Sequence, residues 1–210
     1  ATTFRCSRSR LRSPSSQIGI GLVGVPRSTP DYATLEVLNT ILGGSFTSRL
    51  NQNLRERNGF AYGAASAFDM RTSAGPVFAA SGVQTDKTAD ALREFFVELN
   101  AIRKPVSDEE LAKARNYVAL GFPAEFETSR NLAQKMEELV VYNLPDDTFE
   151  TFISNVTRVT VADVQRAAEK YVQPERMAVV VAGDRKAIEP GIAALGLGPL
   201  RVVPIAEFFK

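Results

Sequence analysis

Hydrophobic and polar positions divide the chain into segments with two different periods. Apolar residues alternate with small or polar ones where β-strands are expected, and they recur every three or four residues where amphipathic helices are expected. The pattern predicts strands at residues 17–25, 61–70, 76–83, 177–182 and about 200–205. It predicts helices that begin near residues 31, 48, 85, 107, 129, 149, 160 and 186. This order predicts an α+β domain, in which helices pack on a mainly antiparallel sheet.

Several local signals set the boundaries of these elements. Gly43 and Gly44 end the first helix and allow close packing there. Ser107, followed by Glu110, forms a capping box that opens a helix, and Pro123 breaks that helix. The apolar run at residues 177–182 predicts a strand that is buried on both faces.

The two strands at residues 61–70 and 76–83 are unusually rich in glycine and alanine. Small side chains in a strand permit another backbone to approach closely. We therefore expect these strands to form a partly uncovered surface, with Gly63, Ala64 and Ala65 as candidate substrate-binding residues.

The first sixteen residues differ in composition from the rest. They are rich in arginine and serine and contain no acidic residue, so residues 1–16 are expected to be an unstructured or cloning-derived leader. Residues 17–210 are expected to form one domain. Cys6, the single cysteine, cannot form an internal disulfide.

Composition excludes several classes of protein. No run of eighteen apolar residues exists, so no membrane insertion is expected, and the mildly acidic body of the chain predicts no nucleic-acid binding. The chain contains no histidine, which excludes Ser-His-Asp and Cys-His catalysis. Because protein zinc sites almost always use histidine or cysteine, no metal site is predicted.

Arg55 and Tyr62 lie seven residues apart, on either side of a predicted stop at Asn58-Gly59. On spacing alone, each residue is more often a solvated or half-buried structural residue. The same spacing also lets both side chains converge as rigid donors, which can stabilise the oxyanion of a tetrahedral intermediate. The residues alone leave both interpretations open.

Three motifs in this order resemble the M16 family of zinc metallopeptidases, in its C-terminal, non-zinc half. They are residues 38–44 leading to Ser48-Arg49-Leu50, residues 54–62 with Arg55 and Tyr62, and residues 179–184 (VVVAGD). The resemblance covers about residues 17–205 and implies an M16-like half-domain. It implies that Arg55 and Tyr62 hold the substrate peptide opposite the metal. The zinc and its HxxEH motif would then belong to another half.

The resemblance predicts a non-catalytic, substrate-binding half of a zinc endopeptidase, inactive alone, with no cofactor of its own. Its expected partners are a peptide substrate and the zinc-bearing half, either an upstream domain or a separate subunit; a dimer is left open. The alternative is an M16-like structural subunit without a proteolytic role, and a self-contained enzyme of another type is a third interpretation. The resemblance suggests a periplasmic location.

Overall fold

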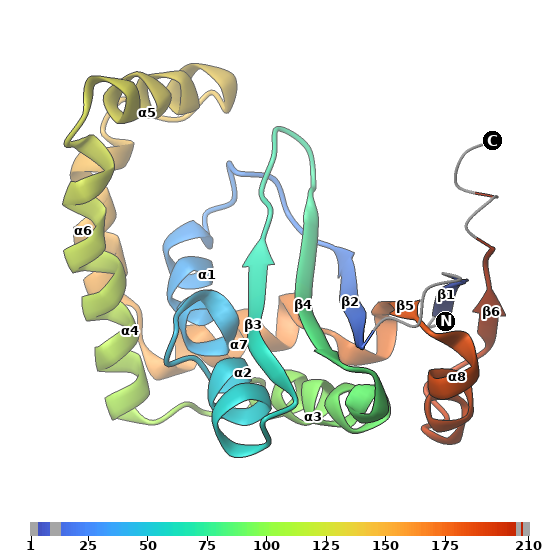
Figure 1. The fold of residues 1–210 in the computed structure, drawn as a ribbon. Helices are drawn as coiled ribbons and strands as arrows, with labels where there is room; N and C mark the ends of the chain where they lie inside the picture. The colour runs from blue at the N-terminus through green and yellow to red at the C-terminus, as the bar shows by residue number, and fades with distance from the viewer. Residues whose placement is uncertain (1–3, 9–13, 205–206, 208–210) are drawn as a thin grey trace.

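A computed structural model of the chain describes residues 4–8, 14–204 and 207 (Figure 1). Six strands form one sheet in the order β3-β4-β2-β5-β1-β6. They are β1 (Phe4–Arg8), β2 (Ser15–Val23), β3 (Ala61–Phe68), β4 (Pro76–Gln84), β5 (Ala178–Gly183) and β6 (Leu200–Val202). The pairs β3–β4, β4–β2 and β2–β5 are antiparallel, whereas β1 runs parallel to both β5 and β6. The predicted α+β fold with a mainly antiparallel sheet is confirmed.

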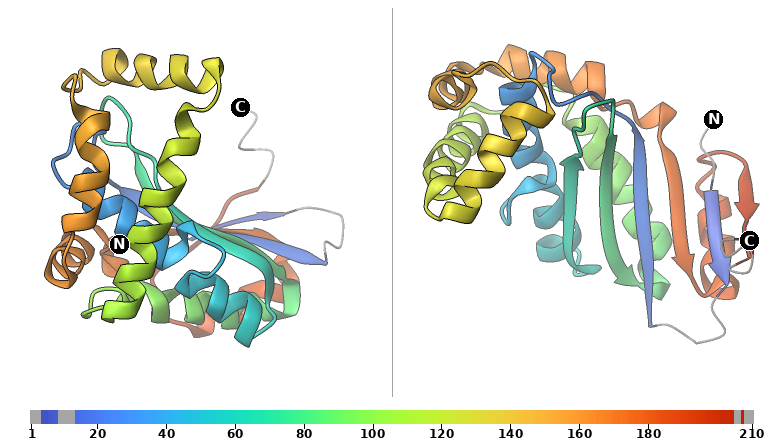
Figure 2. Two further views of the ribbon diagram at one scale, coloured as in Figure 1. Left: turned by 90° about the vertical axis from the view of Figure 1, so that its left-hand side faces the viewer. Right: turned by 90° about the horizontal axis from the view of Figure 1, so that it is seen from above.

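The helices lie mainly behind the sheet and to one side of it. They are α1 (Tyr32–Asn39), α2 (Arg49–Asn51), α3 (Thr88–Ala101), α4 (Asp108–Gly121), α5 (Ser129–Val141), α6 (Thr148–Arg158), α7 (Val161–Tyr171) and α8 (Arg185–Ala194). Shorter helical turns are η1 (Thr40–Gly44), η2 (Gln52–Arg57), η3 (Thr85–Lys87), η4 (Phe122–Phe126) and η5 (Pro174–Arg176). Helices α3 and α7 lie behind the sheet in Figure 1, and α4, α5 and α6 form an arm beyond α1 (Figures 1 and 2). None of the helices in the described residues is long and apolar enough to cross a membrane.

The hydrophobic core lies on one face of the sheet. Along β4, buried and more exposed residues alternate, and the buried ones, such as Val77 and Ala79, face the helices. On β5, Val179 and Val181 are buried, but Val180 between them is 43% exposed. The expectation that this strand is buried on both faces is wrong, because no helix in the described part of the chain covers its second face. This open face is the side of the sheet nearest the viewer in Figure 1.

The interpretation of residues 1–16 as an unstructured leader is also wrong where the structure describes them. Phe4–Arg8 forms β1, which pairs with β5 from Phe4 opposite Val179 to Arg8 opposite Gly183. Strand β2 begins at Ser15, two residues earlier than predicted. Residues 1–3 and 9–13, also part of the predicted leader, lie outside the described residues. The local composition of this segment did not reveal its long-range pairing partners.

The predicted local boundaries hold in the helical region. The Ser107 side chain accepts a hydrogen bond from the Glu110 backbone, and the Glu110 side chain accepts one from the Ser107 backbone, so the capping box is confirmed. The helix ends at Gly121, and Pro123 lies in the following turn η4. Gly59 has a φ of +61° and lies between η2 and β3. That turn directs the chain into the edge strand of the sheet.

Candidate functional site

Arg55 and Tyr62 meet at the start of the edge strand β3. Arg55 lies in the last turn of η2, and Tyr62 is the second residue of β3. The chain reverses between them at Gly59, and Arg55 Cζ comes to 5.7 Å from the centre of the Tyr62 ring. The two side chains therefore lie near each other, and their role in holding a substrate stays a prediction.

A β-bulge directs Tyr62 out of the sheet. Ala61 pairs with Val83 and Ala64 pairs with Ser81, so Tyr62 and Gly63 together lie opposite one residue of β4. An extra residue of this kind bends a strand and changes the direction of its side chains. Tyr62 is consequently 93% exposed, although it belongs to a strand of the central sheet. The phenol hydroxyl is accessible to a ligand on this side.

The three small residues after Tyr62 have different positions. Gly63 and Ala65 are exposed, and the Gly63 carbonyl accepts a hydrogen bond from Ser81 Oγ at 2.7 Å. Ala64 is only 5% exposed and packs in the core. Its backbone N–H and carbonyl both bond to the Asn51 side chain. The expectation that Ala64 contacts a substrate is wrong for its side chain, whereas Gly63 and Ala65 remain on the surface.

The charge of Arg55 is accessible as well. Its side chain is 34% exposed, and its nearest ion-pair partner is the neighbouring Glu56, at 3.3 Å between Nε and Oε1. Because Glu56 is itself about half exposed, the pair is of the weak, solvent-screened type. A ligand carbonyl or carboxylate could therefore compete for the guanidinium.

Phe46 also belongs to this site, although nothing in its sequence context singled it out. Its ring centre is 4.5 Å from Arg55 Cζ, and 61% of the residue is exposed. The sequence shows only that an aromatic residue lies in the loop between Gly44 and Ser48, which does not by itself indicate a functional role. Its proximity to Arg55 depends on how the loop between η1 and α2 folds relative to η2, and spacing alone could not predict it.

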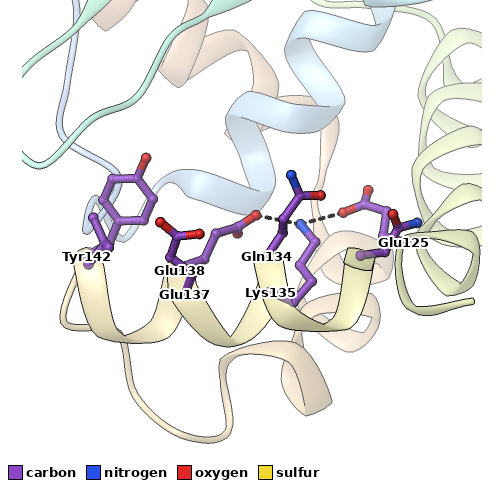
Figure 3. Close-up of a pocket in the computed structure, with 8 residues that line it drawn as sticks. Glu125, Gln134, Lys135, Glu137, Glu138 and Tyr142 are labelled. Carbon is purple, nitrogen blue, oxygen red and sulfur yellow. Dashed lines mark hydrogen bonds and ion pairs between the residues drawn. The ribbon is translucent and has the colours of Figure 1, made fainter. Parts of the chain in front are cut away.

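A cavity of about 490 Å³ lies along α5, away from Arg55 and Tyr62, and is lined mostly by polar side chains (Figure 3). Lys135 Nζ lies in it 2.5 Å from Glu125 Oε2 and 2.9 Å from Glu138 Oε1. Burial lowers the pKa of Lys135, but the hydrogen bonds to Glu125 and Glu138 outweigh it, so the pKa lies above its ordinary value. Lys135 is thus paired with both carboxylates, Glu125 and Glu138. The cavity is therefore a weaker candidate for a ligand site than the corner that carries the exposed donors Arg55 and Tyr62.

No group of three or more histidine, cysteine, aspartate or glutamate side chains within the described ranges could hold a metal ion. A metal-dependent reaction at Arg55 and Tyr62 would need ligands from elsewhere. The small residues beside the pair leave room on the open face for such an approaching group.

Comparison with known protein families shows to which family this chain is related. Residues 2–118 match the model of the peptidase M16 inactive domain, more than half of the chain. The chain belongs to the peptidase M16 family. Within that family it is an inactive domain, which agrees with the absence of the HxxEH motif from its sequence.

The most similar proteins include uncharacterized zinc proteases. One from Mycobacterium tuberculosis is 24% identical over 169 residues, which are 80% of this chain but only 38% of that protein. A crystal structure of a peptidase M16 inactive domain from Pseudomonas fluorescens superimposes with a TM-score of 0.79 at 24% identity, covering 87% of this chain and 43% of that one. A complex III structure from Candida albicans contains the same fold, with a TM-score of 0.75 at 16% identity, 91% of this chain and 48% of that chain. The M16 chain thus spans less than half the length of these relatives.

Proposed function

We propose that this M16 chain is the substrate-binding half of a zinc endopeptidase, which holds a peptide against a zinc-bearing half. That half would be an upstream domain or a separate subunit. The observation that carries the proposal is the convergence of Arg55 and Tyr62 on an exposed corner of the sheet, 5.7 Å from guanidinium carbon to ring centre. Tyr62 does not serve the core, since it is 93% exposed, and the Arg55 side chain is 34% exposed.

The two side chains suit the chemistry of peptide hydrolysis. Attack on a peptide carbonyl places negative charge on its oxygen, and donors already held in position stabilise that charge without reorganising. The Arg55 guanidinium and the Tyr62 hydroxyl would donate to this oxygen from one side. Zinc bound by the other half would supply an activated water and polarise the carbonyl.

The open face of the sheet supports the same proposal. Ala65 pairs with Ala80, and Ala80 pairs with Gly19, so one row across three strands presents only small side chains. These residues lie on the face that the helices leave uncovered, and Ala65 is exposed. An extended peptide can approach such a row closely. The face would thus form one wall of a chamber whose other wall is the zinc-bearing half.

The alternative is a structural subunit without proteolytic activity. The structural-subunit alternative is favoured by the fold that this chain shares with a chain of the complex III structure. The likeness between the two chains is confined to the fold. The two functions differ in what they require of Arg55 and Tyr62. A structural subunit needs neither donor, whereas the peptidase half needs both.

The deciding experiment measures kcat/KM of the chain assembled with its HxxEH-bearing half, using casein that carries self-quenched fluorophores. Loss of one oxyanion donor typically lowers turnover by about 10²–10³-fold, and we expect effects of that order for Arg55→Ala and Tyr62→Phe. Zinc content and melting temperature should be unchanged. The matched controls are Arg130→Ala and Tyr117→Phe, which lie on α5 and α4. Wild-type turnover in both site variants would favour the structural subunit. Cell fractionation tests the periplasmic location, which we retain as part of the proposal.

A further inference from the structure

We propose that Phe46 is a positioning residue that holds the Arg55 guanidinium in place beside Tyr62. This inference rests on the proposed function and adds a third residue to its site. Arg55 Cζ lies 4.5 Å from the Phe46 ring centre, closer than the 5.7 Å that separates it from the Tyr62 ring centre. A guanidinium within about 6 Å of an aromatic ring centre is attracted by the electrons of the ring face.

The loop that carries Phe46 is fixed relative to the strand that carries Tyr62. Ser45, the residue before Phe46, donates from Oγ to the Thr40 carbonyl at 3.1 Å. The Ser45 carbonyl accepts a hydrogen bond from Asn51 Nδ2 at 3.1 Å. The same Nδ2 donates to the carbonyl of Ala64 on β3 at 2.8 Å. One buried amide therefore ties the Phe46 loop to β3, two residues from Tyr62.

Arg55 needs such a support because its other contacts are weak. Its long side chain has many rotamers, and fixing it in one of them costs conformational entropy. The ion pair with the half-exposed Glu56 restrains it little. The face of Phe46 limits the guanidinium to one side and still leaves its N–H groups free to donate. Phe46 contributes little to the core, since it is 61% exposed.

The first measurement is the NMR chemical shift of the Arg55 Nε–H group in the isolated chain, assigned with Arg55→Lys. The Phe46 ring current should displace this resonance, and Phe46→Leu should return it toward the value of a free arginine. Phe46→Tyr should preserve the displacement. Tyr117→Leu is the matched control, because Tyr117 is similarly exposed, at 57%, and lies on α4. An Arg55 resonance that is the same in wild type and Phe46→Leu would overturn the inference.

The second measurement is kcat/KM on fluorophore-labelled casein by the chain assembled with its zinc-bearing half. A cation–π contact at an exposed site corresponds to about two- to fivefold, and we expect Phe46→Leu to lower kcat/KM by that factor through kcat. Phe46→Tyr should restore the wild-type rate. Phe46→Leu should have no further effect in an Arg55→Ala background, because the contact is already absent there.

The outcomes separate this inference from the proposed function. If Arg55→Ala and Tyr62→Phe lower turnover while Phe46→Leu does not, the inference is overturned and the proposed function stands. If Arg55→Ala itself retains wild-type turnover, the proposed function is overturned. The chemical shift of the Nε–H group then still decides whether Phe46 positions Arg55. Loss of the ring-current displacement in Phe46→Leu supports the contact, and a displacement that persists in this variant refutes it.

Discussion

The Asn51 side chain forms two hydrogen bonds to the backbone of Ala64 on the edge strand β3. Asn51 Nδ2 donates to the Ala64 carbonyl at 2.8 Å, and the Ala64 N–H donates to Asn51 Oδ1 at 3.0 Å. Edge strands present unpaired backbone groups that invite pairing with another chain. Asn51 occupies those groups at Ala64, so the peptide proposed above would lie on the open face of the sheet rather than extend its edge at this point.

Replacing Asn51 should therefore destabilise the domain. Asn51→Ala leaves the buried N–H and carbonyl of Ala64 without their partner, and each unsatisfied buried group costs about 1–3 kcal/mol. We expect a loss of at least about 1–3 kcal/mol in the free energy of unfolding, measured by urea denaturation. Asn116→Ala, at an exposed position on α4, is the control. Equal stability of the two variants would show that Ala64 finds water or other partners.

Gly43 should not tolerate a side chain. A Cβ at this position would come within 3.0 Å of the Ser66 backbone nitrogen and 2.9 Å from the Ala65 carbonyl carbon. Backbone cannot move aside as a flexible side chain can, so Gly43→Ala should separate η1 from β3 and cost about 1–3 kcal/mol. Thermal unfolding measures this loss. In the control Gly121→Ala, the added Cβ meets no atom within 4 Å, and the melting temperature should not fall.

Asp31 should make the domain sensitive to acid. Its carboxylate accepts hydrogen bonds from Tyr171 at 2.5 Å, Arg166 at 3.1 Å and Lys170 at 3.2 Å, all on α7. Burial raises the pKa of Asp31, but these hydrogen bonds outweigh it and hold the pKa below its ordinary value. A lowered folded-state pKa adds stability that is complete above the unfolded-state pKa, about 3.9. That stability is lost as the pH falls through the folded-state value.

We expect Asp31→Asn to lower the free energy of unfolding by about 1.5–3 kcal/mol at pH 7. The difference from wild type should shrink as the pH falls below about 3.9, because the carboxylate of the unfolded wild-type chain then takes up a proton that the folded state, with its lower pKa, does not yet bind. Urea unfolding at a series of pH values checks this. Asp146→Asn, on an exposed loop, should have little effect at any pH. A difference for Asp31→Asn that is the same at pH 7 and pH 3 would contradict the role of its charge.

The isolated chain should bind zinc weakly and should not cleave peptides. It has no histidine and one cysteine, whereas protein zinc sites almost always use these residues. The measurement is zinc content by mass spectrometry after dialysis, together with release of fluorescence from labelled casein. One equivalent of retained zinc, or cleavage that a chelator abolishes, would disprove the prediction.

A large side chain on the open face should obstruct the proposed peptide. Ala65→Trp fills the row of small residues, so KM for casein by the assembled enzyme should rise by about tenfold, equal to about 1.4 kcal/mol. Zinc content should be unaffected. Ala112→Trp, at an exposed position on α4, is the matched control. An unchanged KM in Ala65→Trp would place the peptide elsewhere.

The sequence by itself determined the features that depend on near neighbours in the chain. The capping box joins Ser107 and Glu110, which are three positions apart, and the break at Pro123 follows from the ring of that one residue. Arg55 and Tyr62 lie close because one turn at Gly59 joins them. The absence of histidine is a property of the amino-acid composition alone, and it excludes the HxxEH motif from this chain.

Only the tertiary structure decided the features that depend on distant partners. Strand β1 forms because Phe4–Arg8 meets β5, which lies far along the chain, and an Arg- and Ser-rich composition does not encode that meeting. Whether Val180 is buried depends on the helices, which leave its face of the sheet open. The bulge that exposes Tyr62 arises from register against β4. The contact of Phe46 with Arg55 joins a loop residue to the helical turn η2, and side-chain proximity between elements is set by how they pack and not by sequence spacing.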